Sequence, residues 1–330
     1  MRKNYLVAFL TLFFAFGTVN AQSIKQNVSV ETENSSLVFS VDGNNELIFR
    51  HYGKKMNSLN SFSDNLFTPS AHQNFPALYP TYGGRNYNVP ALKLTHGDGV
   101  ICCELELKNI QVNKIDANVT ETVVELKDKV YDLFVDVHYR AYYKEDVITQ
   151  YVSIRSQEKG KVNVEQLASS YLPLQANSYY LTHFFGSWSK EMNLKEEELT
   201  NGIKSIESLK GVRTSQCESP TFILSLNSKS KEDEGEVYGG ALAWSGNYKL
   251  SFQVSEDQML NIVSGMNPFA AALSLEKGDE VTTPEMILTY SSKGKNRMSQ
   301  NFHRWSRKYA LAHGNGQRPV VLNSWEGVGV

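Results

Sequence analysis

Hydrophobic and polar positions alternate over much of the chain between residues 36 and 173. The clearest example is the stretch 133–143, in which apolar or aromatic residues occupy every second position and Asp136, His138 and Arg140 stand between them. An alternation with a period of two is typical of a β-strand that has one face in a core and the other toward water. We therefore expect a strand over 133–143.

Further strands follow from the same pattern, with turn signals between them. Residues 37–41 run into the Asp-Gly-Asn turn signal at 42–44 and then into the apolar stretch 47–49. A polar turn at 144–146 leads into 147–154, which we expect to pair with 133–143. Strands resume at 222–226, 238–244 and 250–254. Many short strands without intervening helices predict an all-β chain, folded as a large antiparallel sandwich.

The alternation weakens between residues 186 and 235, where two runs of charge occur. Glutamates fill 196–198, and charged residues dominate 229–236. We expect both runs to be solvated loop or helix surface. Neighbouring glutamates on one surface run are not taken as paired catalytic carboxylates, because such a pair must flank the scissile bond.

The period changes near the C-terminal end. Met298, Phe302, Trp305 and Tyr309 are spaced by four, three and four residues, which places them on one stripe of a helix. We expect a sandwich domain over 22–295 and a linker over 296–317 that contains this helix.

The pattern of the last segment, 318–330, indicates the start of another domain. Arg318-Pro319 breaks the preceding segment, and an apolar run at 320–322 is followed at once by Asn, Ser, Trp and Glu. Such a run suits a strand buried on both faces, with functional groups just past its end, as in an α/β barrel. A barrel needs about 250 residues. We therefore expect 318–330 to be the start of a truncated catalytic barrel, and its strand to lack a partner.

The N-terminus has the pattern of an export signal. Arg2 and Lys3 precede a short apolar run, and a small-residue site ends at Ala21. We expect residues 1–21 to be a signal peptide and the protein to be periplasmic or extracellular. The apolar run is shorter than the ~20 residues that a membrane span requires, so no span is predicted.

Composition narrows the remaining possibilities. A net charge of -2, with 41% hydrophobic and 21% charged residues, is that of an ordinary globular protein without a basic surface, which argues against nucleic-acid binding. Three cysteines favour buried free thiols over a disulfide from Cys217 to Cys102 or Cys103. The chain has no compact cysteine and histidine motif for zinc and no local signature of a nucleotide site or a catalytic serine. No metal or cofactor is predicted.

An aromatic loop at 75–92 is the clearest candidate for ligand binding. Its tyrosines Tyr79, Tyr82 and Tyr87 alternate with three prolines and a Gly-Gly pair. Tyrosine faces and hydroxyls suit sugar rings, which have apolar faces and polar edges. The alternative is a loop packed on itself, with its tyrosines as a local core.

A set of ordered motifs resembles glycoside hydrolase family 36, the retaining α-galactosidases of the bacterial raffinose and melibiose type. YPTYG at 79–83 with Pro90-Ala91 resembles the family's EYPxYGxxDFRxPA loop, Gly186-Ser187-Trp188 through Glu191 resembles GxWxRE, and Tyr238-Gly239 with 245–247 resembles YGxxLxYSGN. Residues 267–269 match NPF, and 275–278 with 283–285 resemble LxPGExFxTPE. Residues 298–303 resemble MSxxFH, and RPVVLNSWE at 318–326 resembles RPVLxNxWE. The matches occur in order over residues 37–326. Two positions depart from the family loop, since Asn86 stands for its aspartate and Asn88 for its arginine.

The resemblance implies a β-supersandwich followed by a (β/α)₈ barrel that carries both catalytic aspartates. Neither aspartate has a counterpart here, so no catalytic residue is predicted and the chain alone is expected to be inactive. Trp325 and Asp64 are the implied substrate-binding residues, and Tyr82 joins them from the aromatic loop. The implied partners are galactoside oligosaccharides and further copies of the full-length enzyme in a homo-oligomer.

Two other readings stay open. The chain could be a non-catalytic sandwich module that binds sugar or mediates oligomerisation. It could also be an unrelated sandwich enzyme similar to mutarotases, which would need a histidine and glutamate pair that the sequence does not single out.

Overall fold

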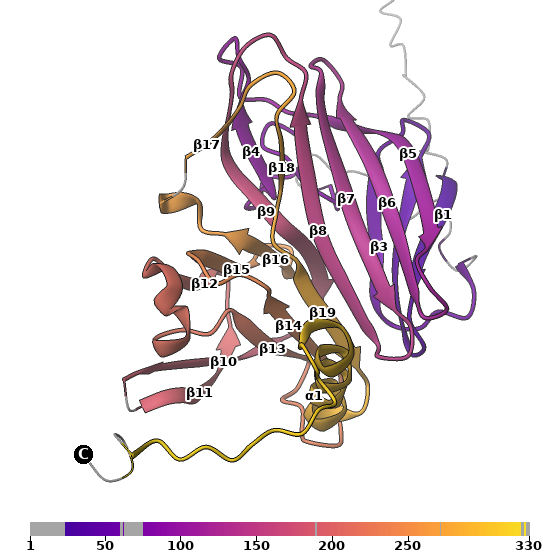
Figure 1. Ribbon diagram of the computed structural model, residues 1–330. Helices are drawn as coiled ribbons and strands as arrows, with labels where there is room; N and C mark the ends of the chain where they lie inside the picture. Colours follow the sequence, from indigo (N-terminus) through magenta and orange to yellow (C-terminus); the bar gives the residue numbers. More distant parts are fainter. Residues whose placement is uncertain are drawn as a thin grey trace, which may run out of the picture.

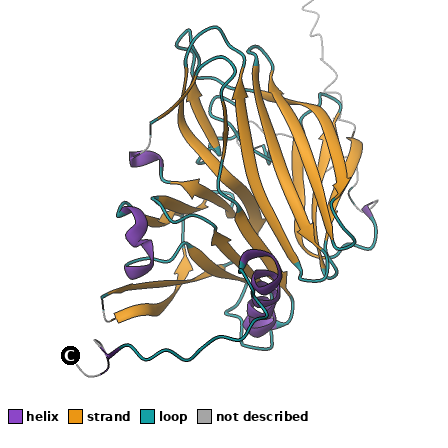
Figure 2. Ribbon diagram, in the orientation of Figure 1, coloured by secondary structure: helices purple, strands orange, loops and turns teal. Residues whose placement is uncertain are grey.

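The computed structural model describes residues 24–59, 62, 75–188, 190–270, 272–324 and 327. Figure 2 shows that strands make up most of the described chain and that a helix follows them near the C-terminal end. No helix in these ranges is both long and apolar enough to cross a membrane. The predicted signal peptide lies outside the described residues.

The largest sheet has ten strands. They are β5 (Leu105–Lys114), β6 (Val119–Asp128), β7 (Leu133–Tyr142), β8 (Val147–Ser156), β10 (Tyr179–Ser187), β11 (Lys190–Leu199), β13 (Thr221–Leu226), β14 (Val237–Leu242), β18 (Glu280–Thr282) and β19 (Met286–Ser291). Their order is β11-β10-β13-β14-β19-β8-β7-β6-β5, and β18 also pairs with β8. Neighbouring strands are antiparallel throughout.

Two smaller antiparallel sheets complete the described part of the fold. One has the order β1 (Ile24–Glu31), β2 (Ser35–Asp42), β3 (Leu47–Lys54). The other contains β4 (Leu92–Thr95), β9 (Val162–Gln175), β12 (Gly202–Ser208), β15 (Tyr248–Val254), β16 (Met259–Met266) and β17 (Leu273–Leu275). Its order is β12-β15-β16-β9-β17, with β4 also paired to β9.

Both smaller sheets pack against the large one (Figure 1). Phe39 of β2 stacks on Tyr139 of β7 with ring centroids 6.3 Å apart, and Phe222 of β13 meets Phe252 of β15 edge to face at 5.1 Å. All four rings are buried in one continuous core. The predicted large antiparallel sandwich is therefore confirmed, and it consists of two sandwiches that share the large sheet.

Several local predictions are also confirmed. Every second residue of β7 is buried from Leu133 to Ala141, and β8 pairs with β7 along its whole length. The turn signal at 42–44 joins β2 to β3, where Asp42 accepts backbone hydrogen bonds from Asn44 at 2.9 Å and Glu46 at 2.8 Å. An aspartate that bonds the backbone ahead of it is what makes this turn sequence effective.

The helix after the sandwich, α1 (Gly294–Trp305), continues as a π-helical turn over Ser306–Ala310. Met298 and Trp305 of the predicted stripe are buried, and Trp305 packs edge-on against Tyr142 with ring centroids 5.7 Å apart. The helix begins earlier than the stripe indicated. Gly294 supplies the positive φ of 71° with which the chain enters it, a conformation that favours glycine.

The interpretation of the glutamate run at 196–198 was wrong, because these residues lie in strand β11 rather than in a loop or helix. β11 is an edge strand, where charged side chains are common because they discourage pairing with other chains. Glu196 forms ion pairs with Lys229 and Lys295, each at 3.0 Å. The second charge run, 229–236, lies outside the strands and helices, as expected.

The three cysteines are free thiols, and only Cys103 is buried. Cys102 is exposed and Cys217 is partly exposed, so the expectation of buried thiols holds for one residue of three. The adjacent Cys102 and Cys103 thus differ in exposure, and strand β5 begins just after them, at Leu105.

The apolar run at 320–322 is extended and fully exposed, and it pairs with no strand in the described part of the chain. This agrees with the expectation that the segment lacks a pairing partner. A strand acquires its backbone hydrogen bonds only from a neighbouring strand, and in the view of Figure 1 this segment passes below β10 and β11 without joining a sheet.

Candidate functional site

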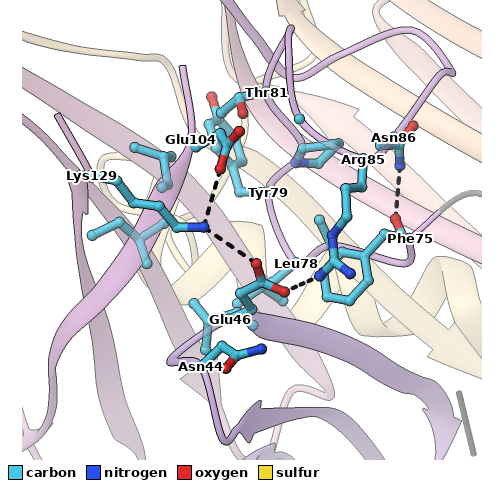
Figure 3. Close-up of a pocket in the computed structure, with 16 residues that line it drawn as sticks. Asn44, Glu46, Phe75, Leu78, Tyr79, Thr81, Arg85, Asn86, Glu104 and Lys129 are labelled. Atoms are coloured by element: carbon cyan, nitrogen blue, oxygen red, sulfur yellow. Dashed lines mark hydrogen bonds and ion pairs between the residues drawn. The ribbon is translucent and has the colours of Figure 1, made fainter. Parts of the chain in front are cut away.

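A pocket of about 350 Å³ opens where the aromatic loop meets the edge of the sandwich that β1–β3 form with the large sheet (Figure 3). Its walls come from the turn between β2 and β3, from residues 75–86, from the start of β5 and from the end of β6 with the turn that follows. Polar and apolar groups are mixed in these walls, as in sites that bind small polar ligands.

The aromatic loop is held in place by hydrogen bonds to distant parts of the chain. Tyr79 is buried, and its hydroxyl donates to the carbonyl of Ala168 in β9 at 2.7 Å. The hydroxyl of Thr81 donates to the carbonyl of Cys103. These bonds tie one wall of the pocket to the core of the fold.

Gly83 explains why the loop sequence requires glycine at this point. Its φ of +91° disfavours any side chain, and a Cβ there would lie 2.6 Å from the Sγ of Cys102 and 2.7 Å from its Cα. The loop can approach the segment before β5 this closely only without a side chain at position 83.

Two cations and two carboxylates form a network in the pocket. Glu46 accepts from Arg85 and, at 3.4 Å, from the Nζ of Lys129, which also lies 3.1 Å from Glu104 (Figure 3). The guanidinium of Arg85 lies 4.2 Å from the ring centroid of Phe75. The network is electrically balanced, and its groups can exchange partners with the hydroxyls of a ligand.

The carboxylates set the protonation state of Lys129. Burial by itself lowers the pKa of Lys129, but the hydrogen bonds and charges of Glu104 and Glu46 outweigh burial and raise the pKa above its ordinary value. Lys129 is therefore a cation at neutral pH. Both carboxylates of the pocket are thus paired with cations.

The predicted site residues are placed only in part. The side chain of Tyr82 is exposed, and the ammonium of Lys93 lies 5.5 Å from its ring centroid. Its neighbours Thr81 and Gly84 line the pocket, whereas Tyr82 is not among the lining residues. Asp64 and Trp325 lie outside the described residues. A sugar-binding role for these three residues stays a prediction.

The two departures from the family loop have a structural role. Asn86 and Asn88 are both buried. The amide of Asn86 donates to the carbonyl of Phe75 at 3.2 Å, and its oxygen accepts from the backbone N–H of Asn88 at 2.9 Å. Neutral hydrogen bonds thus shape the loop here, where the family pattern places an aspartate and an arginine.

A histidine and glutamate pair of the kind that a mutarotase-like enzyme needs does exist. The Nδ1 of His96 lies 2.9 Å from Glu158, but the side chain of His96 is 0% exposed and that of Glu158 is 8% exposed. A substrate cannot reach a pair that is buried in this way, so this pair does not support the mutarotase-like alternative. His183 also pairs with Glu197 at 3.2 Å, and there the glutamate side chain is 27% exposed.

Comparison with protein families identifies what the chain is similar to. The model described as Glycosyl hydrolase family 36 N-terminal domain matches residues 45–276, and the model described as Melibiase matches residues 280–330. Alpha-galactosidase AgaA of Geobacillus stearothermophilus is 30% identical over 267 residues, which are 75% of this chain and 36% of the relative. Alpha-galactosidase Mel36A of Lactobacillus acidophilus is 28% identical, and the match covers 78% of this chain and 37% of the relative.

Solved structures agree on the fold. The crystal structure of AgaA from Geobacillus stearothermophilus superposes with a TM-score of 0.83 at 23% identity, over 91% of this chain and 46% of that one. The galactosidase domain of AgaSK superposes with a TM-score of 0.82 at 24% identity, over 92% of this chain and 46% of that one. A variant of AgaA in complex with raffinose superposes with a TM-score of 0.81 at 23% identity, over 91% of this chain and 46% of that one. The chain thus spans less than half the length of these relatives.

Proposed function

Because the chain belongs to glycosyl hydrolase family 36, we propose that it forms the N-terminal part of an exported retaining α-galactosidase, which hydrolyses terminal α-linked galactose from oligosaccharides such as raffinose and melibiose. The family match over residues 45–276 is the observation that carries this proposal. Support comes also from the second match, which starts at residue 280, just before β19 and α1.

Under this proposal the reaction proceeds by double displacement with net retention. Two carboxyl groups about 5–5.5 Å apart carry it out, one as nucleophile and one as acid and base. We place both in the barrel domain of the longer protein, in keeping with the family resemblance. The described residues contribute a preformed pocket, and α1 joins the sandwich to the segment that enters the barrel.

Residues 1–21 support the proposal that the protein is exported, since their charged start, short apolar run and small-residue site have the pattern of a signal peptide. Expression of the intact chain followed by mass spectrometry of the secreted product tests this point. A mature N-terminus at Gln22 is expected, and retention of Met1 in the exported fraction contradicts it.

The activity is tested by comparing two proteins. The reading frame that contains this chain, expressed at full length, should hydrolyse a chromogenic α-galactoside, and proton NMR should show the α-anomer of galactose as the first product. The 330-residue chain alone should give no turnover. A full-length protein inactive on α-galactosides but active on another glycoside refutes the substrate class, and a β-anomer as first product refutes retention.

A second candidate function is a binding module that acts without catalysis, and the pocket around Glu46 favours it. Calorimetric titration of the isolated chain with galactose and raffinose distinguishes the two functions. Binding that Glu46→Gln weakens, while an exposed control such as Glu234→Gln leaves it unchanged, supports a sugar-binding module. Absence of binding by the chain, combined with activity of the full-length protein, leaves the sandwich a structural part of the enzyme.

We also propose that the full-length enzyme is a homo-oligomer that acts on galactoside oligosaccharides. Light scattering during size-exclusion chromatography measures the assembly directly. A monomer at working concentration contradicts this part of the proposal without affecting the proposed reaction.

A further inference from the structure

Three side chains that metals favour converge beside the pocket, at one end of the large sheet. His96 follows β4, Cys103 precedes β5 and Asp128 ends β6. A ring nitrogen of His96, the thiol sulfur of Cys103 and a carboxylate oxygen of Asp128 all lie within 4.8 Å of one another. Each of the three residues is at most 2% exposed.

The imidazole of His96 is oriented by its neighbours and keeps one nitrogen without a partner. Its Nδ1 lies 2.9 Å from an oxygen of Glu158, and the ring of Tyr131 stacks on it at 3.7 Å with an interplanar angle of 12°. The Nε2 is buried and has no hydrogen-bond partner among the residues that the structure describes. If Nδ1 carries the proton and donates to the carboxylate, Nε2 presents a lone pair, as in the carboxylate–histidine pairs of many metal sites.

A close backbone contact builds this arrangement. Gly97 packs on Gly160 so tightly that a Cβ at Gly97 would lie 2.5 Å from the Cα of Gly160. The contact brings the turn after β4 against the segment after β8, and it thereby places His96 beside Glu158.

The carboxylate of Asp128 is anchored and still has capacity to bind. Its Oδ1 accepts from the backbone N–H groups of Val130 and Tyr131, both at 2.8 Å, and its Oδ2 accepts from that of Glu104 at 3.1 Å. A carboxylate oxygen has about two acceptor sites, so Oδ1 is saturated and Oδ2 retains one lone pair. The thiol of Cys103 hydrogen-bonds this carboxylate, so an ion bound between the two groups takes the place of the thiol proton.

We propose that His96 Nε2, Cys103 Sγ and Asp128 Oδ2 bind one divalent cation of the zinc type, with water as the fourth ligand. The mixture of one nitrogen, one sulfur and one oxygen suits Zn²⁺ and Co²⁺ and excludes Mg²⁺ and Ca²⁺, which prefer oxygen ligands alone. The thiol proton leaves to solvent when the ion binds. The thiolate and the carboxylate then balance the charge of the cation inside a buried site.

The required movement is small. Bond lengths of about 2.0–2.3 Å place the ligand atoms of a tetrahedral zinc site roughly 3.3–3.6 Å apart. Atoms that already lie within 4.8 Å need to approach by about 1 Å.

The ion has a structural role in this proposal. Glu104 and Lys129, which carry half of the charge network in the pocket, directly follow Cys103 and Asp128 in the chain. A metal that joins these two segments braces one wall of the pocket. The inference concerns the sandwich alone and does not depend on the proposed galactosidase activity.

The test uses the full chain with Cys102→Ser and Cys217→Ser, which replaces the two thiols that are not buried and leaves Cys103 as the only sulfur of cysteine. The chain is stripped with a chelator and titrated with Co²⁺, both in the native state and during refolding from urea. We expect one Co²⁺ per chain and a thiolate-to-cobalt charge-transfer band in the near ultraviolet. A folded chain that shows no such band under either condition overturns the proposal.

Two further variants locate the site. Glu158→Gln, which alters only the partner of His96, should weaken Co²⁺ binding by about 10–100-fold. Glu165→Gln, a control at an exposed glutamate, should leave it unchanged. Equal affinities in both variants contradict the assignment of His96 as a ligand. X-ray absorption of the Zn²⁺-loaded chain should show one sulfur neighbour, and a shell of nitrogen and oxygen alone also overturns the proposal.

Discussion

Strand β14 carries two adjacent glycines that face opposite sides of the large sheet, and the first of them offers a sharp test of how α1 is held. A Cβ at Gly239 would lie 2.6 Å from both Met298 and Phe302 of the helix. A Cβ at Gly240 would instead collide with the ring of Phe222 in the core. We expect Gly239→Ala to loosen α1 selectively.

The magnitude follows from these distances. Carbon atoms in contact lie about 3.5–4.0 Å apart, so the added methyl group is about 1 Å too close to the helix, and such overpacking costs about 1–3 kcal/mol. Burial of Met298 and of Trp305 stabilises the docked helix by about 1.5–3 kcal/mol each. The helix should therefore stay docked but open more often, by about 5–150-fold.

Hydrogen exchange measured by mass spectrometry on peptides from 294–310 is the assay, with the free energy of unfolding in urea measured in parallel. Gly239→Ala should accelerate exchange in these peptides more than in β6 or β7. Gly240→Ala is the matched control, because its methyl group enters the core and should lower the free energy of global unfolding. Unchanged exchange of 294–310 in Gly239→Ala, or an equal effect of the two variants, refutes this account of helix docking.

Three further outcomes are expected. Burial raises the pKa of Glu196, but hydrogen bonds to Lys229 and Lys295 outweigh it and leave the pKa below its ordinary value. A carboxyl group with a depressed pKa stabilises the fold above the unfolded pKa of about 4.3, and this stabilisation is lost as the pH falls through the folded pKa. In urea titrations, Glu196→Gln should therefore lower the free energy of unfolding by about 0.2–1 kcal/mol at pH ~7, and the difference from wild type should disappear in acid. Gly83→Ala should lower the free energy of unfolding by at least about 1–3 kcal/mol through its positive φ, and thermal denaturation that matches wild type contradicts the required conformation. Val321→Lys should reduce aggregation seen by light scattering, since it places a charge in an exposed apolar run; unchanged scattering rules this segment out as the cause.

Much of the fold could be predicted because the relevant signals are local. The alternation over 133–143 states which side chains must be buried, and the same alternation of burial is seen in β7. The stripe from Met298 to Trp305 predicts a helix with one buried face in the same way. The motif order, read as a resemblance, indicated the family that the comparisons then confirmed.

The glutamates at 196–198 show where local signals fail. A charged run has no apolar face, so its periodicity indicates neither strand nor helix. It becomes strand β11 because β10 offers a row of backbone groups to pair with, and Glu196 gains its two lysines only from the loop after β13 and from α1. Pairing between distant segments decided this element.

The candidate sites likewise depend on contacts between distant segments. Glu46, Arg85 and Lys129 come from three separate segments, and no spacing in the sequence links them. His96 and Cys103 likewise form no recognisable motif, and Asp128 joins them only because β6 ends where β5 begins. The sequence by itself determined which faces are buried, since burial follows from the side chain at each position. The tertiary structure decided which polar groups meet, because that depends on strand pairing across the whole chain.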